Sequence, residues 1–236
     1  MELRSNAGTR AGGDLYEVVH TPFGVRAIIG DVAGYGPEAI GLAAEVLTGF
    51  RELALHETGI AGIAFRIDAF LSLRDDQPFV TAVLVQFAPD GSYADLVCCG
   101  HPPPLVLRGG RTVSTQDLGP ALPLGLQDLD SGWYSASWLP LQPGDAVLLY
   151  SGGVTGGGAP QAGDYPIAER AARFSSVDPA RFLDRLESDL LTHLGGKPPT
   201  DVTLLYLRPE RDPAGRSPAP PLRIPALGPE WPDRPL

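Results

Sequence analysis

Two aspartates near the N-terminus are the residues whose type and spacing most clearly predict a shared functional site. Asp14 ends the segment GGD, and Asp31 lies in IGDVAGYG. Between them, TPFG at 21–24 is a turn signal that joins two strand-like runs. If TPFG forms a four-residue loop, residue 20 faces residue 25 and Asp14 faces Asp31. Directly opposed residues lie about 4.5–5.5 Å apart at Cβ, where two like charges destabilise the pair.

A cation between the two carboxylates would make this placement favourable. Glycines surround both aspartates, at positions 12, 13, 30, 34 and 36. They leave room for backbone carbonyls and waters, and oxygen ligands of this kind suit Mg²⁺ or Mn²⁺. A second interpretation is that both aspartates cap a turn and a helix at the end of the hairpin. The hairpin geometry alone leaves metal binding and capping open.

Other candidate motifs predict less. GYGPEAIG at 34–41 places glycines before a helix but lacks the lysine of a P-loop, so a cap or tight turn is favoured over phosphate binding. His101 in CGHPPPLV has the chemistry of a general base, yet a histidine held in a proline turn is the favoured interpretation. Ser151 has no G-x-S-x-G context, which argues against an esterase. The remaining histidines show no metal-ligand spacing: His20, His56 and His193.

Composition and charge exclude several classes of protein. The 236 residues are 43% hydrophobic and 19% charged, as in a globular chain. A formal net charge of −10 argues against nucleic acid and anionic membrane as main partners. No apolar run approaches the about 20 residues that a membrane span requires, and MELRSNAGTRAGGD lacks an apolar signal region, so we expect a cytoplasmic protein.

Cys98 and Cys99 are adjacent, which predicts buried thiols and no mutual disulfide.

The elements that position the aspartates follow from the hydrophobic periodicity. Strands are expected at 15–20 and 25–32, and helices at 37–57 and 60–73. Strand-like segments then follow in the order FVTAVLVQFA, SYADLVCCG, PPLVLRGG, RTVST, WYSASWL and AVLLYS. Helices at about 167–174 and 178–194 and a strand at 201–207 complete the pattern. The order predicts an α+β sandwich of mainly antiparallel sheets.

The C-terminal segment differs in composition from the rest. Residues 209–236 contain nine prolines and few hydrophobic residues. We therefore expect a domain at 1–208 and an extended or disordered tail at 209–236, or an arm laid on a neighbouring chain in a homodimer.

Seven ordered segments resemble one known family. They are AGGDLYE, IGDVAGYGPEAIGLAAEVL, FVTAVLVQFAPDG, CGHPPPLVLRGG, LPLGL, LQPGDAVLLYSGGVTG and TDVTLLYL, spanning about residues 8–208. Their order is similar to that of PPM-type protein serine/threonine phosphatases, in the bacterial branch typified by the sporulation phosphatase SpoIIE and the stress-response phosphatase RsbU.

The resemblance implies a fold, a reaction and a set of ligands. The implied fold is a four-layer α-β-β-α sandwich with two Mn²⁺ or Mg²⁺ ions at one end. The implied reaction is attack of a metal-activated water on a phosphoserine or phosphothreonine. Asp31 resembles the aspartate that bridges both metals, the Val32 carbonyl resembles the adjacent backbone ligand, and Asp14 resembles the aspartate that holds metal-bound water.

The chain departs from the family pattern at the second metal. Relatives have Thr-Asp-Gly where this chain has Ser151-Gly152-Gly153, and Asp-Asp where it has Thr200-Asp201. Gly152 and Thr200 are therefore degenerate ligand positions, which predicts one Mn²⁺ or Mg²⁺ and leaves the second site in doubt. Gly-His-Gly, frequent in the branch, is here Gly34-Tyr35-Gly36.

Two functional hypotheses follow from this ligand set. The first is a protein phosphatase of bacterial signalling with reduced activity, whose substrate is a phosphorylated anti-sigma-factor antagonist. The second is a catalytically inactive pseudophosphatase that binds the same partner.

Overall fold

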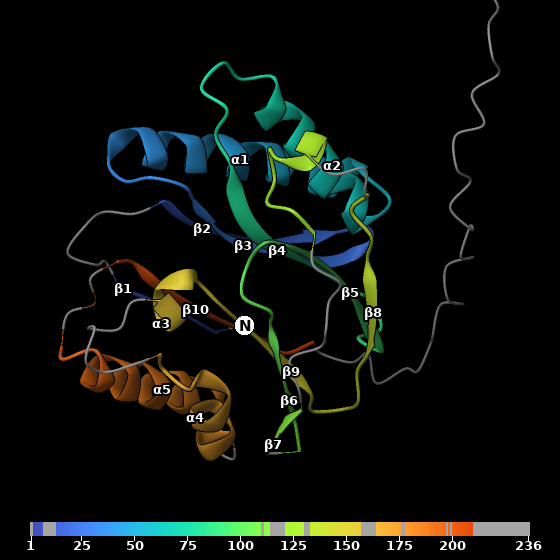
Figure 1. The fold of residues 1–236 in the computed structure, drawn as a ribbon. Coiled ribbons are helices and arrows are strands. Elements are labelled where there is room, and N and C mark those ends of the chain that lie inside the picture. The colour runs from blue at the N-terminus through green and yellow to red at the C-terminus, as the bar shows by residue number, and fades with distance from the viewer. Residues whose placement is uncertain are drawn as a thin grey trace, which may run out of the picture.

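Two antiparallel sheets of five strands each form the centre of the structure (Figure 1). The computed structural model describes residues 2–6, 13–109, 111–113, 121–129, 133–156, 164–175, 178–196, 198 and 200–209. The first sheet has the order β2-β3-β4-β5-β8, with strands Gly13–Thr21, Gly24–Val32, Val80–Phe87, Tyr93–Cys99 and Ser137–Pro140. The second has the order β1-β10-β9-β6-β7, with strands Glu2–Asn6, Val202–Leu207, Ala146–Tyr150, Leu105–Arg108 and Arg111–Val113.

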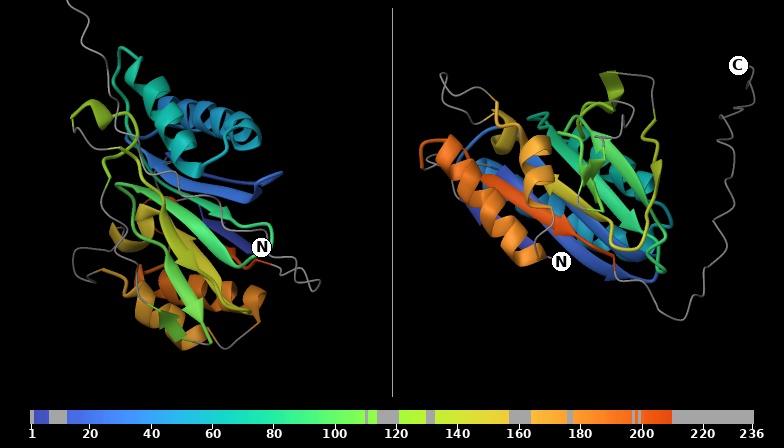
Figure 2. Two further views of the ribbon diagram at one scale, coloured as in Figure 1. Left: turned by 90° about the vertical axis from the view of Figure 1, so that its right-hand side faces the viewer. Right: turned by 90° about the horizontal axis from the view of Figure 1, so that it is seen from below.

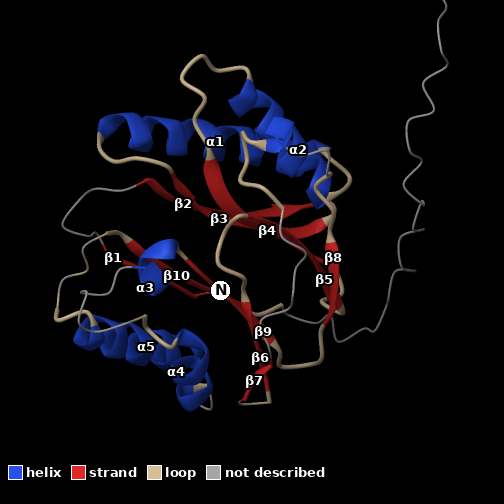
Figure 3. Ribbon diagram, in the orientation of Figure 1, coloured by secondary structure: helices blue, strands red, loops and turns tan. Residues whose placement is uncertain are grey.

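Helices cover the outer face of each sheet. Helices α1 (Pro37–His56) and α2 (Ile60–Ser72) lie over the first sheet. Helices α4 (Ile167–Phe174) and α5 (Pro179–His193) lie over the second (Figure 3). The left view in Figure 2 shows the two helix pairs on opposite sides of the strands. The predicted four-layer α-β-β-α sandwich is thereby confirmed.

Three apolar layers hold these four layers together. One lies between α1 and α2 and the first sheet, one between the two sheets, and one between the second sheet and α4 and α5. Strand β4 alternates between two of them, because Leu84 packs toward the helices while Val83 and Val85 pack between the sheets. Alternation of this kind follows from the period of two in a strand. It assigns each strand residue to a known layer.

A buried arginine ties the end of α1 to the first sheet. The Arg26 side chain, from β3, is fully buried and donates hydrogen bonds to the carbonyl oxygens of Ala54, Glu57 and Thr58 at 2.6–3.0 Å. It also donates to Oε1 of Gln86 on β4. A cation suits this place because the last carbonyls of a helix are without backbone partners and carry partial negative charge.

Most elements lie where the sequence predicts them, and three differ. Strand β1, which pairs with β10, was not predicted, since ELRSN lacks an alternating apolar pattern. The glycine segment after β9, where the sequence predicts neither helix nor strand, forms the short helix α3 (Gly152–Gly156). In WYSASWL only the end is strand, as part of β8. Residues 210–236, almost all of the predicted tail, lie outside the described residues.

Two further expectations concern cysteines and membranes. Cys98 and Cys99 are both free thiols, and Cys99 is buried while Cys98 is half-buried. Among the described helices, none is long and apolar enough to cross a lipid bilayer.

Candidate functional site

The first hairpin pairs in the predicted register. Asp14 lies opposite Asp31 in the antiparallel pair of β2 and β3. The turn is tighter than expected, since Thr21 and Gly24 are themselves paired and only two residues lie between them. The register is the same for both turn lengths, so the two carboxylates face each other as predicted.

Close packing explains the glycine that neighbours each aspartate. A Cβ atom at Gly13 would lie 2.5 Å from Cβ of Val32, and one at Gly30 would lie 2.3 Å from the Thr81 carbonyl oxygen. Cβ atoms do not approach other atoms this closely, so these positions need glycine for the strands to meet. The glycines thus bring β2, β3 and β4 together around the aspartates.

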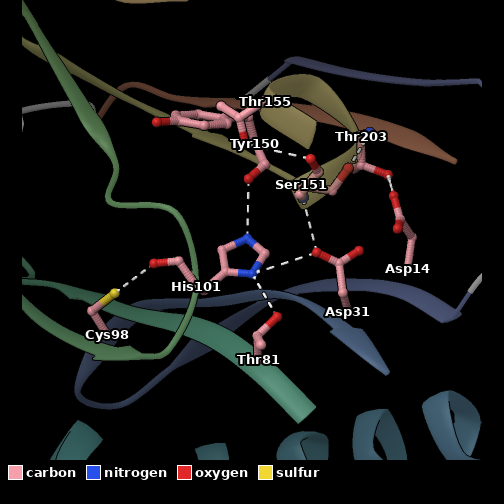
Figure 4. A network of polar contacts seen from close by, with 10 residues as sticks. Asp14, Asp31, Thr81, Cys98, His101, Tyr150, Ser151, Thr155 and Thr203 are labelled. Carbon is pink, nitrogen blue, oxygen red and sulfur yellow. Dashed lines mark hydrogen bonds and ion pairs between the residues drawn. The ribbon is translucent and has the colours of Figure 1, made fainter. Parts of the chain in front are cut away.

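The polar residues of the site continue the rows that form the apolar layer between the sheets. On β3, Asp31 follows Ala27 and Ile29, which both belong to that layer. On β10, Thr203 precedes Leu205 and Leu207 in the same way. The same period of two places Asp14, Thr81 and Ser151 at this end of the sandwich. One end of the layer between the sheets is therefore polar (Figure 4).

Hydrogen bonds across the two sheets hold the aspartates. The Thr203 hydroxyl donates to Oδ2 of Asp14 at 2.8 Å, and the Thr203 backbone N–H donates to Oγ of Ser151 at 2.9 Å. The Gly152 backbone N–H donates to Oδ2 of Asp31 at 2.9 Å. Strand β10 of the second sheet therefore supplies a donor to Asp14, and the start of α3, just after β9, supplies a donor to Asp31.

Electrostatics favour a cation at the opposed carboxylates. Burial, and then the hydrogen bond and charge of Asp31, raise the pKa of Asp14 to about 8, although hydroxyl groups of Thr203 and Ser151 act in the opposite direction. A cation would relieve the same repulsion by favouring the ionised form. Asp14, Asp31 and Val32 line one cavity, and carboxylate and backbone carbonyl oxygens are the ligands that fit a hard divalent ion. Within the described residues, no group of three or more His, Cys, Asp or Glu side chains could hold a metal.

The cavity beside the aspartates has a volume of about 300 Å³. Besides the aspartates, it is lined by Gly152, Gly153, Thr200, Asp201 and Tyr35. The structure thus brings together Asp14, Asp31, Val32, Gly152 and Thr200, the residues that the family resemblance assigns to the two metal sites. Tyr35 is 57% exposed.

The two glycines after Ser151 differ in what surrounds them. A Cβ at Gly152 would point at Asp31, 3.1 Å from Oδ2, so a carboxylate at this position would lie beside the Asp31 carboxylate. A Cβ at Gly153 would lie 2.1 Å from the Asp201 carbonyl oxygen. Gly153 is therefore required by packing, whereas Gly152 is a position where a side chain would enter the site.

His101 is part of the site, although the sequence indicated only a histidine held in a proline turn. Its side chain is fully buried, and Nδ1 lies 3.6 Å from Oδ2 of Asp31. Nε2 lies 3.0 Å from the Tyr150 carbonyl oxygen, and Nδ1 lies 3.1 Å from Oγ1 of Thr81. Burial lowers the pKa of His101 to about 4, so the ring is neutral near pH 7. Nothing in CGHPPPLV reveals contacts with residues so distant in sequence.

Comparison with known protein families shows to which family the chain belongs. The profile of the family described as stage II sporulation protein E (SpoIIE) matches residues 21–210. The chain belongs to the SpoIIE family. It is a PPM-type (PP2C) serine/threonine phosphatase domain of the bacterial branch that includes SpoIIE and RsbU. Asp14 lies just before the matched residues of this SpoIIE domain.

Solved structures of three bacterial proteins share the fold of this SpoIIE domain. The RsbU and RsbW domains of Rv1364c from Mycobacterium tuberculosis align with a TM-score of 0.71 at 26% identity, over 90% of this chain and 61% of that chain. The SiaA-PP2C domain of Pseudomonas aeruginosa gives a TM-score of 0.74 at 18% identity, over 89% and 85%. A SpoIIE fragment from Bacillus subtilis, comprising the phosphatase domain and part of the regulatory domain, gives 0.69 at 18%, over 89% and 65%. The SpoIIE domain therefore spans less than two thirds of the first and third of these chains.

Proposed function

We propose that this domain is a phosphoserine/phosphothreonine protein phosphatase of bacterial signalling that holds one Mn²⁺ or Mg²⁺ ion well and turns over slowly. The observation that carries the proposal is the pair of opposed carboxylates, Asp14 and Asp31, at a cavity where the neighbouring Gly152 provides no side chain. Membership of the family supports the class of reaction. The absence of a carboxylate at positions 152 and 200 is the reason why we propose slow turnover.

Each residue of the chain has a role in this proposal. Asp31 and the Val32 carbonyl would hold the cation, which when bound supplies Lewis-acid charge for activating water and offsetting phosphoryl charge. Asp14, fixed by the Thr203 hydroxyl, orients water at the cavity. The Gly152 N–H fixes the direction of the Asp31 carboxylate.

The same residues argue against a well-held second ion. Gly152 has no side chain and Thr200 no carboxylate, so two anionic ligands that relatives provide are absent at these positions. An ion left to water and one carboxylate is weakly bound, since little negative charge offsets its own. If only one of two metal ions contacts the attacking water, the activation barrier to hydrolysis rises by several kcal/mol, which lowers the rate on the order of 10²-fold or more.

The substrate proposed is a phosphorylated anti-sigma-factor antagonist. Support comes from the branch to which the domain belongs and from the Mycobacterium tuberculosis relative, whose structure contains an RsbU and an RsbW domain. A further similar structure is described as part of the bacterial stressosome, a system that controls secondary messenger signalling.

The bare position at Gly152 also favours a second candidate function. A pseudophosphatase that docks the same phosphorylated partner without turnover would keep the scaffold and lose the second metal. Turnover separates the two candidates, because the fold is the same in both.

Metal titration tests the proposal. We expect calorimetry with Mn²⁺ to give one site per chain, and Asp31→Asn to abolish it. Asp75→Asn is the matched control, since Asp75 is an exposed aspartate after α2. Slow Mn²⁺-dependent hydrolysis of a phosphoserine protein supports the phosphatase, and binding without hydrolysis supports the pseudophosphatase. Two tight sites per chain would contradict the single-ion proposal.

A further inference from the structure

We propose that His101 is a positioning residue, a hydrogen-bonded spacer that fixes the separation between Asp31 on one sheet and the β9–α3 junction on the other. The consequence for metal binding rests on the proposed function. The positioning itself rests on the contacts of the imidazole and is testable without metal or substrate.

The imidazole lies between elements of both sheets. Nε2 is 3.0 Å from the carbonyl oxygen of Tyr150, the last residue of β9 in the second sheet. Nδ1 is 3.1 Å from Oγ1 of Thr81, which belongs to β4 in the first sheet. Figure 4 shows the ring between these two partners, with Asp31 beside it. The side chain has no exposed surface, so the ring fills the space between the sheets.

The partners determine which ring nitrogen carries the hydrogen. A carbonyl oxygen only accepts hydrogen bonds, so Nε2 must carry a hydrogen and donate it to Tyr150. In a neutral ring Nδ1 is then the acceptor, and the Thr81 hydroxyl donates to it. At 3.6 Å, the distance from Nδ1 to Oδ2 of Asp31 is longer than a hydrogen bond. The ring therefore touches Asp31 as a packed neighbour.

The contacts of His101 and Gly152 close a loop around Asp31. Tyr150, which accepts from the imidazole, is only two residues before Gly152, whose N–H donates to Oδ2 of Asp31 at 2.9 Å. The length of the imidazole ring, from Nδ1 to Nε2, thus sets the distance between the Gly152 amide and the Asp31 carboxylate. A shorter or mobile side chain at position 101 would let the junction shift relative to β3.

The local backbone is built to direct the ring into this space. Gly100 has a φ of +63°, in the left-handed region that favours glycine. A Cβ at Gly100 would also lie 2.7 Å from Cγ of Pro123, so packing requires glycine there as well. The following prolines, Pro102 to Pro104, restrict the chain after the histidine. The glycine before His101 and the prolines after it therefore fix the direction of the His101 side chain beyond the end of β5.

The contacts fit a spacer better than an acid or base. A proton-transferring group must reach the reacting atoms, yet His101 is enclosed and both of its nitrogens already have partners inside the protein. Glutamine can present a carbonyl oxygen to Thr81 and an N–H to Tyr150, and it cannot transfer protons at neutral pH. Leucine fills a similar volume without either hydrogen bond. These two replacements therefore separate spacing from proton transfer.

Amide hydrogen exchange in the metal-free protein is the first test. We expect the Gly152 amide of His101→Leu to exchange at least about 10-fold faster than wild type, measured relative to core amides of α1, since a buried hydrogen bond holds the junction. We expect His101→Gln to stay within about 3-fold and Thr81→Val, which loses the donor to Nδ1, to lie between. His56→Gln, at an exposed histidine at the end of α1, is the control and should change nothing.

Mn²⁺ affinity is the second readout, with the same variants. His101→Leu should weaken Mn²⁺ binding about 10-fold or more, since a displaced junction misplaces Asp31. His101→Gln should keep most of the wild-type affinity. If wild type binds no Mn²⁺, the proposed function fails and the exchange measurement still decides the role of His101. An unchanged Gly152 amide in His101→Leu, or equal loss in the Gln and Leu variants, would overturn the positioning role. If the Leu variant does not fold, an unchanged Gly152 amide in Thr81→Val would overturn it as well.

Discussion

Asp31 is the residue on which the contacts of this site converge. It faces Asp14 across the hairpin, accepts the Gly152 N–H, and lies against the imidazole of His101. The pairing with Asp14 was predictable, because a turn signal and two strand-like runs determine a register. The contacts with Gly152 and His101 were not, since 121 and 70 residues separate these positions from Asp31 and no local pattern joins them.

Placing carboxylates at positions 152 and 200 is the sharpest test of the proposed ligand loss at the scale of single residues. In the double variant Gly152→Asp, Thr200→Asp, we expect Mn²⁺-dependent hydrolysis of an aryl phosphate to rise by at least about 10²-fold, because both carboxylates that we propose a second ion needs would then be present. Each single variant should gain much less. The metal-free double variant should also melt at a lower temperature than wild type and recover with Mn²⁺, since a carboxylate at 152 lies beside Asp31.

The result also separates the two candidate functions. No gain in the double variant would indicate that the loss extends beyond these positions and would favour the pseudophosphatase. Wild-type turnover on the order of 1 s⁻¹ or faster would contradict a degenerate site and leave an ordinary phosphatase.

The two neighbouring glycines should respond differently to alanine. Gly153→Ala should destabilise the domain by about 2 kcal/mol or more, because its Cβ would overlap the Asp201 carbonyl oxygen. Gly152→Ala meets only the end of the Asp31 side chain and should cost less than about 1 kcal/mol. Gly49→Ala, in open space on α1, is the control and should be neutral or stabilising. Urea unfolding of the three variants checks this order, and equal losses at 152 and 153 would refute it.

At the scale of elements, the site forms where strand rows change from apolar to polar. Strands β3 and β10 each supply apolar residues to the layer between the sheets and end it with Asp31 or Thr203. The period of two made the strands predictable, but the sequence does not say which strands from the two sheets face each other. Helix α3 was missed because glycine favours loops, whereas here the buried Val154 anchors a helical turn.

The Arg26 clamp gives a prediction at this scale. Arg26→Met should lower the free energy of unfolding by about 3 kcal/mol, since three carbonyl acceptors at the end of α1 would lose their donor. Arg51→Met, which removes an exposed pairing with Glu17, should cost less than about 1 kcal/mol. Urea unfolding of both variants measures the difference. Similar losses in the two variants would show that α1 does not depend on the buried guanidinium.

At the scale of the whole molecule, the described sandwich is complete as a packed unit at Leu207. Strand β10 is the last element of the described chain, and it contributes to both the layer between the sheets and the layer under α5. The mainly antiparallel α+β architecture was predictable from the order of the elements. The partner strand of β10 was not, because β1 at the sheet edge shows little apolar pattern of its own.

We therefore propose that residues 209–236 are dispensable for folding. A chain that ends before Glu210 should keep its melting temperature to within a few degrees, because every described element that forms the three apolar layers precedes that residue. The tail still holds large apolar residues, among them Leu222, Ile224, Leu227 and Trp231. A matched variant of the full chain with these four changed to serine separates their contribution from that of chain length. A loss of more than a few degrees in both proteins would show that the tail packs on the domain and would refute the boundary.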